Sequence, residues 1–176
     1  MFVKICGIKT PEMAELACEH GADAIGVVAY KKSKRYVAPE QAKAIKNAIN
    51  GRCPLVVVSV SKEDCEPYAS FADYVQADDA NTSETQILSG SERPDGIFRY
   101  FLYDASRGAG LRSDYPDWIE EYSDRLILAG GLDSDNVIDV IEKYKPFGVD
   151  VSSGVETDGE KDIEKIKVFI NNAKTN

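Results

Sequence analysis

Apolar strand segments alternate with helical segments along the whole 176-residue chain, which predicts an α/β fold built from right-handed βαβ units. Continuous apolar runs at 24–29 and 55–60 indicate parallel strands that helices cover on the outside. One strand fewer than the eight of a full barrel is evident, and such barrels typically need ~200 residues or more. We therefore predict a single domain over 1–176, a shortened (β/α)8 TIM barrel whose fifth βα unit is reduced or missing.

The predicted strands and helices follow one another in regular order. The strands are 2–6, 24–29, 54–60, 73–76, 97–103, 125–129 and 147–151, and the helices are 10–20, 39–50, 61–72, 81–88, 135–145 and 162–173, with a further helix beginning at Pro116. Residue types that favour helix starts support these assignments, because Thr10 precedes Pro11 and Ser134 precedes the helix at 135. His20, the only histidine, ends the first helix, where we expect a structural or solvent-facing role.

The shortening lies between Asp79 and Ile97, where a barrel would usually hold a helix, a strand and a second helix. A capping-box-like start at Asn81 predicts one short helix that reaches Leu88. An open gap would leave unpaired strand edges, which proteins normally cover. Two closures are therefore possible: a short segment within 83–93 fills the fifth position, or the strands on either side of it pair directly.

The charge and the absence of long apolar runs limit the possible partners and locations. A net charge of −9 argues against nucleic acid and anionic membrane surfaces. No apolar run approaches the ~20 residues of a membrane-spanning helix. The N-terminus passes straight into a strand that contains Lys4, so no signal peptide is expected. These features favour a cytoplasmic location.

The cysteines predict neither a metal site nor a disulfide framework. Cys6, Cys18, Cys53 and Cys65 form no Cys-x-x-Cys pair, and a single histidine adds little to a zinc site. A disulfide framework is not expected in a chain this long and this well supplied with core residues. A reducing compartment fits best.

Polar residues stand where several predicted strands end, which is the edge at which (β/α) barrels hold their active sites. Cys6 ends the first strand, Asp104 follows the strand at 97–103, and Arg35 lies in the loop after the second strand. A thiol and a carboxylate across a barrel mouth suit proton transfer, provided that the pKa of the thiol falls and that of the carboxyl rises. The alternative for Cys6 is a small buried packing residue.

The last two strands end in Gly130-Gly131 and Ser152-Ser153-Gly154, which expose backbone N–H groups beside helix starts. Barrels bind phosphate at such turns, so these residues predict a phosphate site. The alternative is that glycine serves the turn conformation alone. Arg35 can hold a substrate carboxylate through two hydrogen bonds, although a run such as Lys31 to Arg35 is more often a solvated loop.

Lys4 shares a strand face with Cys6 and should therefore point into the barrel. A buried lysine needs a partner. The last strand of a barrel neighbours the first, and Asp150 is the acid on that strand before the Ser-Ser-Gly turn. We therefore predict a contact between Lys4 and Asp150.

Longer motifs extend from the first strand to the last helix. They are Lys4-Ile5-Cys6-Gly7-Ile8, Ser33-Lys34-Arg35-Tyr36-Val37, Ala129-Gly130-Gly131-Leu132 with Asn136-Val137, and Gly148-Val149-Asp150-Val151-Ser152-Ser153-Gly154-Val155-Glu156 with Lys161-Asp162. Together they resemble the motifs of the phosphoribosylanthranilate isomerase family. That resemblance implies a (β/α) barrel enzyme of tryptophan biosynthesis that works without a cofactor.

The implied reaction is the Amadori rearrangement of N-(5-phosphoribosyl)anthranilate to 1-(2-carboxyphenylamino)-1-deoxyribulose 5-phosphate. The resemblance makes Asp104 the general acid that opens the ribose ring and Cys6 the general base that takes the C2 proton. The implied substrate-binding residues are Arg35 for the anthranilate carboxylate, the late turns Gly130, Gly131, Ser152, Ser153 and Gly154 for the phosphate, and Asp150. The partner is a small phosphorylated molecule, and the oligomeric state stays open.

Two segments depart from the family pattern. The family usually has a Gln-Leu-His-Gly-like segment after the fourth strand, where this chain has Gln76-Ala77-Asp78-Asp79, and the loop after Asp104 keeps only part of a glycine-rich motif, in Arg107-Gly108-Ala109-Gly110. An alternative function is therefore a non-catalytic phosphate-binding barrel that acts as a regulator. Another sugar-phosphate isomerase or epimerase on the same fold is a third reading.

Overall fold

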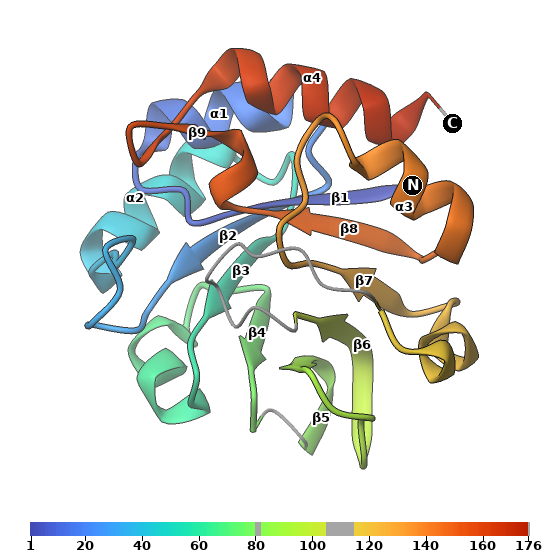
Figure 1. Ribbon diagram of the computed structural model, residues 1–176. Coiled ribbons are helices and arrows are strands. Elements are labelled where there is room, and N and C mark those ends of the chain that lie inside the picture. The colour runs from blue at the N-terminus through green and yellow to red at the C-terminus, as the bar shows by residue number, and fades with distance from the viewer. Residues whose placement is uncertain (80–81, 105–114, 176) are drawn as a thin grey trace.

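Eight parallel strands close into a barrel in the computed structural model, which describes residues 1–79, 82–104 and 115–175 (Figure 1). The strands follow the order of the chain around the barrel: β1 (Phe2–Cys6), β2 (Ala24–Val28), β3 (Leu55–Val58), β4 (Tyr74–Ala77), β5 (Thr82–Gly90), β6 (Ile97–Tyr103), β7 (Leu126–Leu128) and β8 (Gly148–Val151). The prediction of a (β/α) barrel from alternating strands and helices is thus confirmed.

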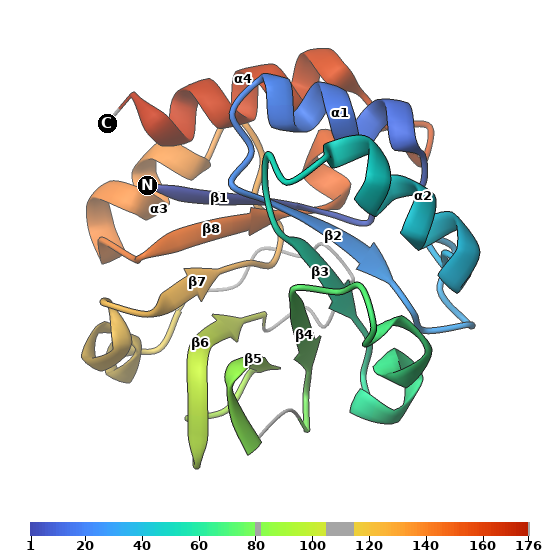
Figure 2. The same ribbon diagram turned by 180° about the vertical axis from the view of Figure 1, so that it is seen from behind.

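The helices lie on the outside and gather around one part of the barrel. The α-helices are α1 (Pro11–Glu19), α2 (Pro39–Ile49), α3 (Val137–Tyr144) and α4 (Ile163–Lys174), and the 3-10 helices are η1 (Lys62–Tyr68), η2 (Asp117–Tyr122) and η3 (Ser153–Val155). The α-helices cover the side formed by β1, β2 and β8, as both views show (Figures 1 and 2). A two-stranded hairpin of β9 (Glu156–Thr157) and β10 (Glu160–Lys161) precedes α4.

The fifth position of the barrel is occupied by a strand, so the predicted helix at 81–88 is wrong. Of the two alternatives for the fifth unit, reduced or missing, the missing unit is also wrong. Strand β5 is nine residues long and pairs in parallel with β4 on one side and β6 on the other. Of the two closures considered, a segment that fills the gap is the one found. The helix-start signal at Asn81 in the sequence is local and weak. When the segment is extended, by contrast, the edges of β4 and β6 each gain a partner. The described residues between β5 and β6, 91–96, contain no helix.

The other element boundaries agree with the predictions to within a few residues, apart from two helices. The segments after β3 and before β7 form 3-10 helices rather than α-helices, and the first of them contains Pro67, which disfavours an α-helix there. Thr10 caps α1 as predicted, because its side chain accepts a hydrogen bond from the Met13 N–H. Asn136, not Ser134, occupies the cap position of α3. His20 is exposed at the end of α1.

Aromatic rings close the N-terminal end of the barrel. Phe147 stacks on Phe2 with ring centroids 5.3 Å apart and on Tyr100 at 5.0 Å. Next to these rings, inside the barrel, lies an apolar cluster that includes Val56, Ile87, Leu102 and Ile127. Side chains therefore fill this end of the barrel, and the polar strand ends found in the sequence lie at the opposite, C-terminal end. No helix in the described part of the chain is long and apolar enough to cross a membrane.

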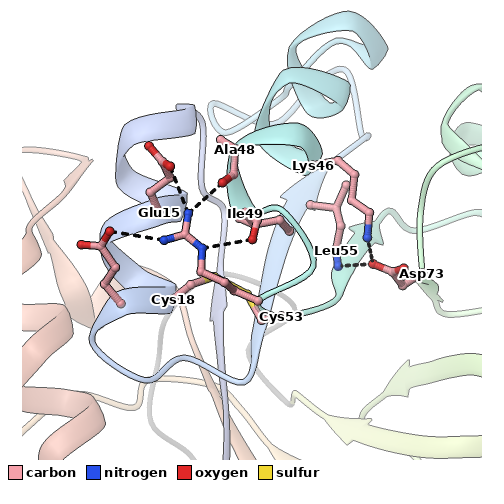
Figure 3. Close-up of a disulfide and its surroundings, with 10 residues drawn as sticks. Glu15, Cys18, Lys46, Ala48, Ile49, Cys53, Leu55 and Asp73 are labelled. Carbon is pink, nitrogen blue, oxygen red and sulfur yellow. Dashed lines mark hydrogen bonds and ion pairs between the residues drawn. A yellow bond between two sulfur atoms is a disulfide. The ribbon is translucent and has the colours of Figure 1, made fainter.

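A disulfide joins Cys18, near the end of α1, to Cys53, in the loop that follows α2 (Figure 3). The expectation of a chain without disulfides is therefore corrected. The two cysteines are 35 residues apart in sequence, and the packing of α1 against α2 brings them together. Arg52 strengthens the same junction, since its guanidinium lies 3.0 Å from Glu15 and 3.3 Å from Glu19 on α1.

Candidate active site

A cavity of about 340 Å³ opens at the C-terminal ends of the strands. Among the predicted site residues, Cys6, Arg35, Asp104, Asp150 and Ser152 line it, so side chains from β1, β8 and the loops after β2, β6 and β8 meet in one space. The surface of the cavity is more apolar than polar. The closed barrel thus assembles the predicted thiol, carboxylate and arginine, although these residues are far apart in the sequence.

Lys4 lies inside the barrel and forms the predicted contact with Asp150. Its Nζ is 2.6 Å from Asp150 Oδ1, and the Lys4 side chain is fully buried. The two residues are direct neighbours in the β1–β8 register. Burial by itself would lower the pKa of Lys4, but the attraction of Asp150 and of the nearby Cys6 outweighs it and raises that pKa. Lys4 is therefore a fixed positive charge beneath the cavity.

The thiol of Cys6 fits closely against the neighbouring strand. A Cβ atom added at Gly26 of β2 would lie 3.0 Å from Cys6 Sγ, so glycine at that position leaves room for the sulfur. Burial raises the pKa of the Cys6 thiol, while the positive charges of Lys4 and Lys161 act in the opposite direction. The fall in this pKa that proton abstraction by Cys6 requires is therefore not found, because burial outweighs the two positive charges.

Asp104 stands directly after β6, across the cavity from the β1–β2 side. Its backbone N–H donates a hydrogen bond to the Gly90 carbonyl at the end of β5, at 3.0 Å. This bond fixes the start of the loop, and the half-buried Asp104 side chain lines the cavity. The glycine-containing segment 106–110, which the sequence placed after Asp104, lies outside the described residues.

Arg35 is held in place by Glu156 of the β9 strand. Its Nε and Nη2 groups donate to the two Glu156 carboxylate oxygens at 2.6 and 2.9 Å. Lys161 donates to the same carboxylate at 2.7 Å and to the Ser152 carbonyl at 2.9 Å. The arginine side chain passes over Gly7, where an added Cβ would lie 2.5 Å from Arg35 Cδ. Glycine after Cys6 is thus needed for the arginine to reach the cavity.

The carboxylate of Glu156 should make folding stability depend on acid pH. Burial would raise its pKa, but hydrogen bonds from Arg35 and Lys161 outweigh this and lower the pKa to about 2. A depressed pKa contributes stability that is complete above the ordinary value of 4.5 and is lost as the pH falls toward 2. We expect the gap in unfolding free energy between wild type and Glu156→Gln to shrink across this window. Urea unfolding at several pH values measures it, and a gap that is constant from neutral pH to about 2.5 contradicts the assignment.

The two late turns pack against one another at the ends of β7 and β8. Gly130 and Gly131 have positive φ angles of 89° and 66°. A Cβ at position 154 would lie only 1.9 Å from the Leu132 carbonyl oxygen. The second turn can therefore approach the first this closely only because residue 154 is glycine. The Asn136 side chain donates to the Gly131 carbonyl at 2.9 Å and holds the first turn. The predicted phosphate-binding segments are therefore side by side.

Sequence reasoning missed some residues that now belong to the site. In the sequence, Glu156 and Lys161 are recognisable only as part of a long motif, which gives them no role of their own. No local signal in the sequence shows that they hold Arg35 in place. Gln76 and Ser89 line the cavity from β4 and β5, together with Asp78, which directly follows β4. The rule that barrel strands end at the site could have identified Gln76 and Asp78. Ser89 was hidden because its strand was predicted as a helix.

Comparison with known proteins gives one family. The family model of N-(5'-phosphoribosyl)anthranilate (PRA) isomerase matches residues 72–172. The N-(5'-phosphoribosyl)anthranilate isomerase of Streptococcus mutans is 40% identical over 190 residues, which cover 98% of this chain and 98% of that protein. The corresponding enzyme of Listeria welshimeri is 38% identical over 200 residues, with 99% and 98% covered.

Solved structures agree with the sequence relatives. The phosphoribosyl anthranilate isomerase of Thermotoga maritima superposes with a TM-score of 0.80 at 34% identity, and the match covers 100% of both chains. Another solved structure, of a phosphoribosyl anthranilate isomerase in complex with reduced 1-(o-carboxyphenylamino)-1-deoxyribulose 5-phosphate, has a TM-score of 0.78 and 34% identity over 100% of both chains. Family model, relatives and fold all point the same way, and the chain belongs to the N-(5'-phosphoribosyl)anthranilate isomerase family, whose members are isomerases of tryptophan biosynthesis.

Proposed function

We propose that this cavity carries out the Amadori rearrangement of N-(5'-phosphoribosyl)anthranilate, with Asp104 as general acid and Cys6 as general base. The observation that carries the proposal is the placement of these two groups in one cavity, on β1 and after β6. Ring opening and C2 deprotonation act on different substrate atoms, so two groups on separate walls suit them. Burial raises the pKa of Cys6, and the fixed charge of Lys4 beneath it opposes that rise and so favours the thiolate that the second step needs.

The proposed steps conserve atoms and electrons. Asp104 gives its proton to the furanose oxygen while the C1–O bond breaks, and the lone pair of the anilino nitrogen forms a C=N bond. The Cys6 thiolate then removes the C2 proton, the electrons of that C–H bond form a C1=C2 bond, and the π electrons of the C=N bond return to nitrogen as its lone pair. The resulting enol loses its O–H proton as C1 gains one, which yields the aminoketose. Hydrogen moves within the substrate, so no external oxidant or reductant is required.

Two groups of residues bind the ends of the substrate in this proposal. Arg35 receives the anthranilate carboxylate, and Glu156 holds its guanidinium in place at the cavity wall. The fork on Glu156 uses two of the five N–H donors of an arginine, so the guanidinium has further donors to offer. The phosphate lies between Gly130-Gly131 and Ser152-Ser153-Gly154 and is bound mainly by backbone N–H groups. Asp150 acts from below, through Lys4.

A bulky residue in the first phosphate turn should weaken substrate binding. Gly131 has a φ of 66°, a conformation that β-branched residues rarely adopt. We expect Gly131→Val to raise KM at least about tenfold while kcat changes less, because phosphate contacts exist both before and during the reaction. Steady-state kinetics measures this. An unchanged KM in a folded Gly131→Val protein would place the phosphate elsewhere.

The same proposal includes a shortened fifth βα unit and a cytoplasmic enzyme. The unit supplies Ser89 and Gly90 to the cavity, while 91–96 lead directly to β6, so its strand serves the site without a helix of its own. Cytoplasmic location is expected for a member of a tryptophan-biosynthesis family that acts on a small phosphorylated substrate.

Complementation tests the function as a whole. A tryptophan auxotroph that lacks this isomerase should grow without tryptophan when it expresses the chain, and an inactive Asp104→Asn variant is the control. Failure of the well-expressed wild type to complement, together with absence of activity in the purified protein, would overturn the proposal in favour of a non-catalytic phosphate-binding barrel.

A further inference from the structure

The cavity wall formed by β4 and β5 contains a buried amide with an unfilled hydrogen-bonding position. Gln76 is 6% exposed, and its Oε1 has no hydrogen-bond partner among the described residues. A buried acceptor without a partner is costly, and few remain in native proteins unless something else satisfies them. Gln76 lines the cavity, so its amide lies beside the space that a ligand would fill.

The strand geometry points Gln76 and Ser89 inward. Gln76 pairs in register with Ile87, which belongs to the interior cluster, and side chains two residues apart share a strand face. Tyr74 packs on that cluster from the same face of β4, and Ser89 follows Ile87 on the same face of β5. The amide and the hydroxyl therefore face the same hollow.

Asp78 extends this wall toward the solvent. Its Oδ1 accepts a hydrogen bond from the Ser89 hydroxyl at 2.9 Å, and its side chain is exposed at the rim of the cavity. The hydroxyl of Ser89 is thus used as a donor within the wall, which leaves the Gln76 oxygen and the Asp78 carboxylate as the acceptors of this wall. Such a wall accepts hydrogen bonds and repels anions.

We propose that Gln76 and Asp78 form a subsite that accepts hydrogen bonds from the sugar hydroxyl groups of the substrate. This inference rests on the proposed function. The substrate carboxylate and phosphate are anions, which the wall disfavours and for which Arg35 and the late turns provide positive or N–H-rich sites. Besides the single anilino N–H, the hydroxyl groups of the five-carbon sugar are the polar groups that donate hydrogen bonds, and they match a buried acceptor. Gln76 is the specificity-determining residue of this subsite, and Asp78 supports it at the rim.

Two inhibitors that differ only in the hydroxyl groups test the subsite. One is reduced 1-(o-carboxyphenylamino)-1-deoxyribulose 5-phosphate, and the other is 5-(2-carboxyphenylamino)pentyl phosphate, which keeps the ring, the carboxylate, the anilino N–H and the phosphate. Dissociation constants are measured by calorimetry for wild type and Gln76→Leu. We expect Gln76→Leu to weaken the hydroxylated compound at least about tenfold and to leave the alkyl compound unchanged or bound more tightly, because the variant no longer leaves an acceptor unpaired.

A second pair of variants guards against an effect on folding. Asp78→Ala changes an exposed side chain, and Asp79→Ala is its matched control, since Asp79 is also exposed but does not line the cavity. We expect Asp78→Ala to weaken the hydroxylated compound selectively and Asp79→Ala to change neither. If Gln76→Leu does not fold, Asp78→Ala decides the question.

Any other outcome contradicts the proposed subsite. Equal weakening of both compounds would show that Gln76 serves packing or the anilino nitrogen, and no change in either would show that the wall is not used. If wild type binds neither compound, the proposed function fails together with the subsite. If wild type binds both compounds but the variants do not discriminate between them, the proposed function survives and only the subsite fails.

Discussion

Replacing Lys4 with methionine is expected to destabilise the fold by about 3–5 kcal/mol. The substitution keeps most of the volume of the side chain but removes the charge that lies 2.6 Å from Asp150. Asp150 is itself 8% exposed, so its carboxylate would remain buried without its ion-pair partner. Urea unfolding monitored by circular dichroism gives the free energy of unfolding for each protein.

The matched control is Lys9→Met, which removes a lysine from an exposed pair. Lys9 Nζ lies 2.5 Å from Glu160, whose side chain is 69% exposed. Exposed pairs contribute only ~0–1 kcal/mol, so a small effect is expected there. The double variant Lys4→Met/Asp150→Leu should recover much of the stability that Lys4→Met loses, because no buried charge then lacks a partner. A loss below about 1 kcal/mol for Lys4→Met would contradict this account of the pair.

Removal of either proton-transfer group is expected to lower kcat by about 10²–10⁴-fold, or ~3–5 kcal/mol of barrier. Asp104→Asn keeps the shape of the side chain but leaves no proton for the ring oxygen. Cys6→Ser also keeps the shape, but its hydroxyl has a pKa far above that of a thiol. KM should change little in both, because neither group holds the carboxylate or the phosphate. Steady-state kinetics of the purified variants measures both constants, and unfolding curves like that of wild type are the control.

The barrel could be predicted well because each strand has a local signal in the sequence. Apolar runs such as 24–29 fold into strands of nearly the same bounds, and strand neighbours in a barrel are known in advance. The contact between Lys4 and Asp150 followed from that order alone and is confirmed at 2.6 Å. Where the topology determines which residues meet, the sequence is therefore sufficient.

Features that depend on tertiary packing could not be predicted from local sequence signals or from strand order. The strand at 82–90 has a local helix-start signal and is extended only because β4 and β6 pair with it. The disulfide between Cys18 and Cys53 depends on how two helices pack. The pKa of Cys6 rises because the thiol is buried, and the sequence does not show how strongly burial opposes nearby positive charge.

The kcat of Cys6→Ser, measured beside wild type at saturating substrate, tests the central claim most directly. The account requires the sulfur at the end of β1 to remove the C2 proton. It predicts that the variant binds substrate with nearly unchanged KM and retains less than about one hundredth of kcat. If a folded Cys6→Ser protein retains more than about a tenth of kcat, less than one decade of catalysis has been lost. Cys6 would then be a packing residue rather than the base.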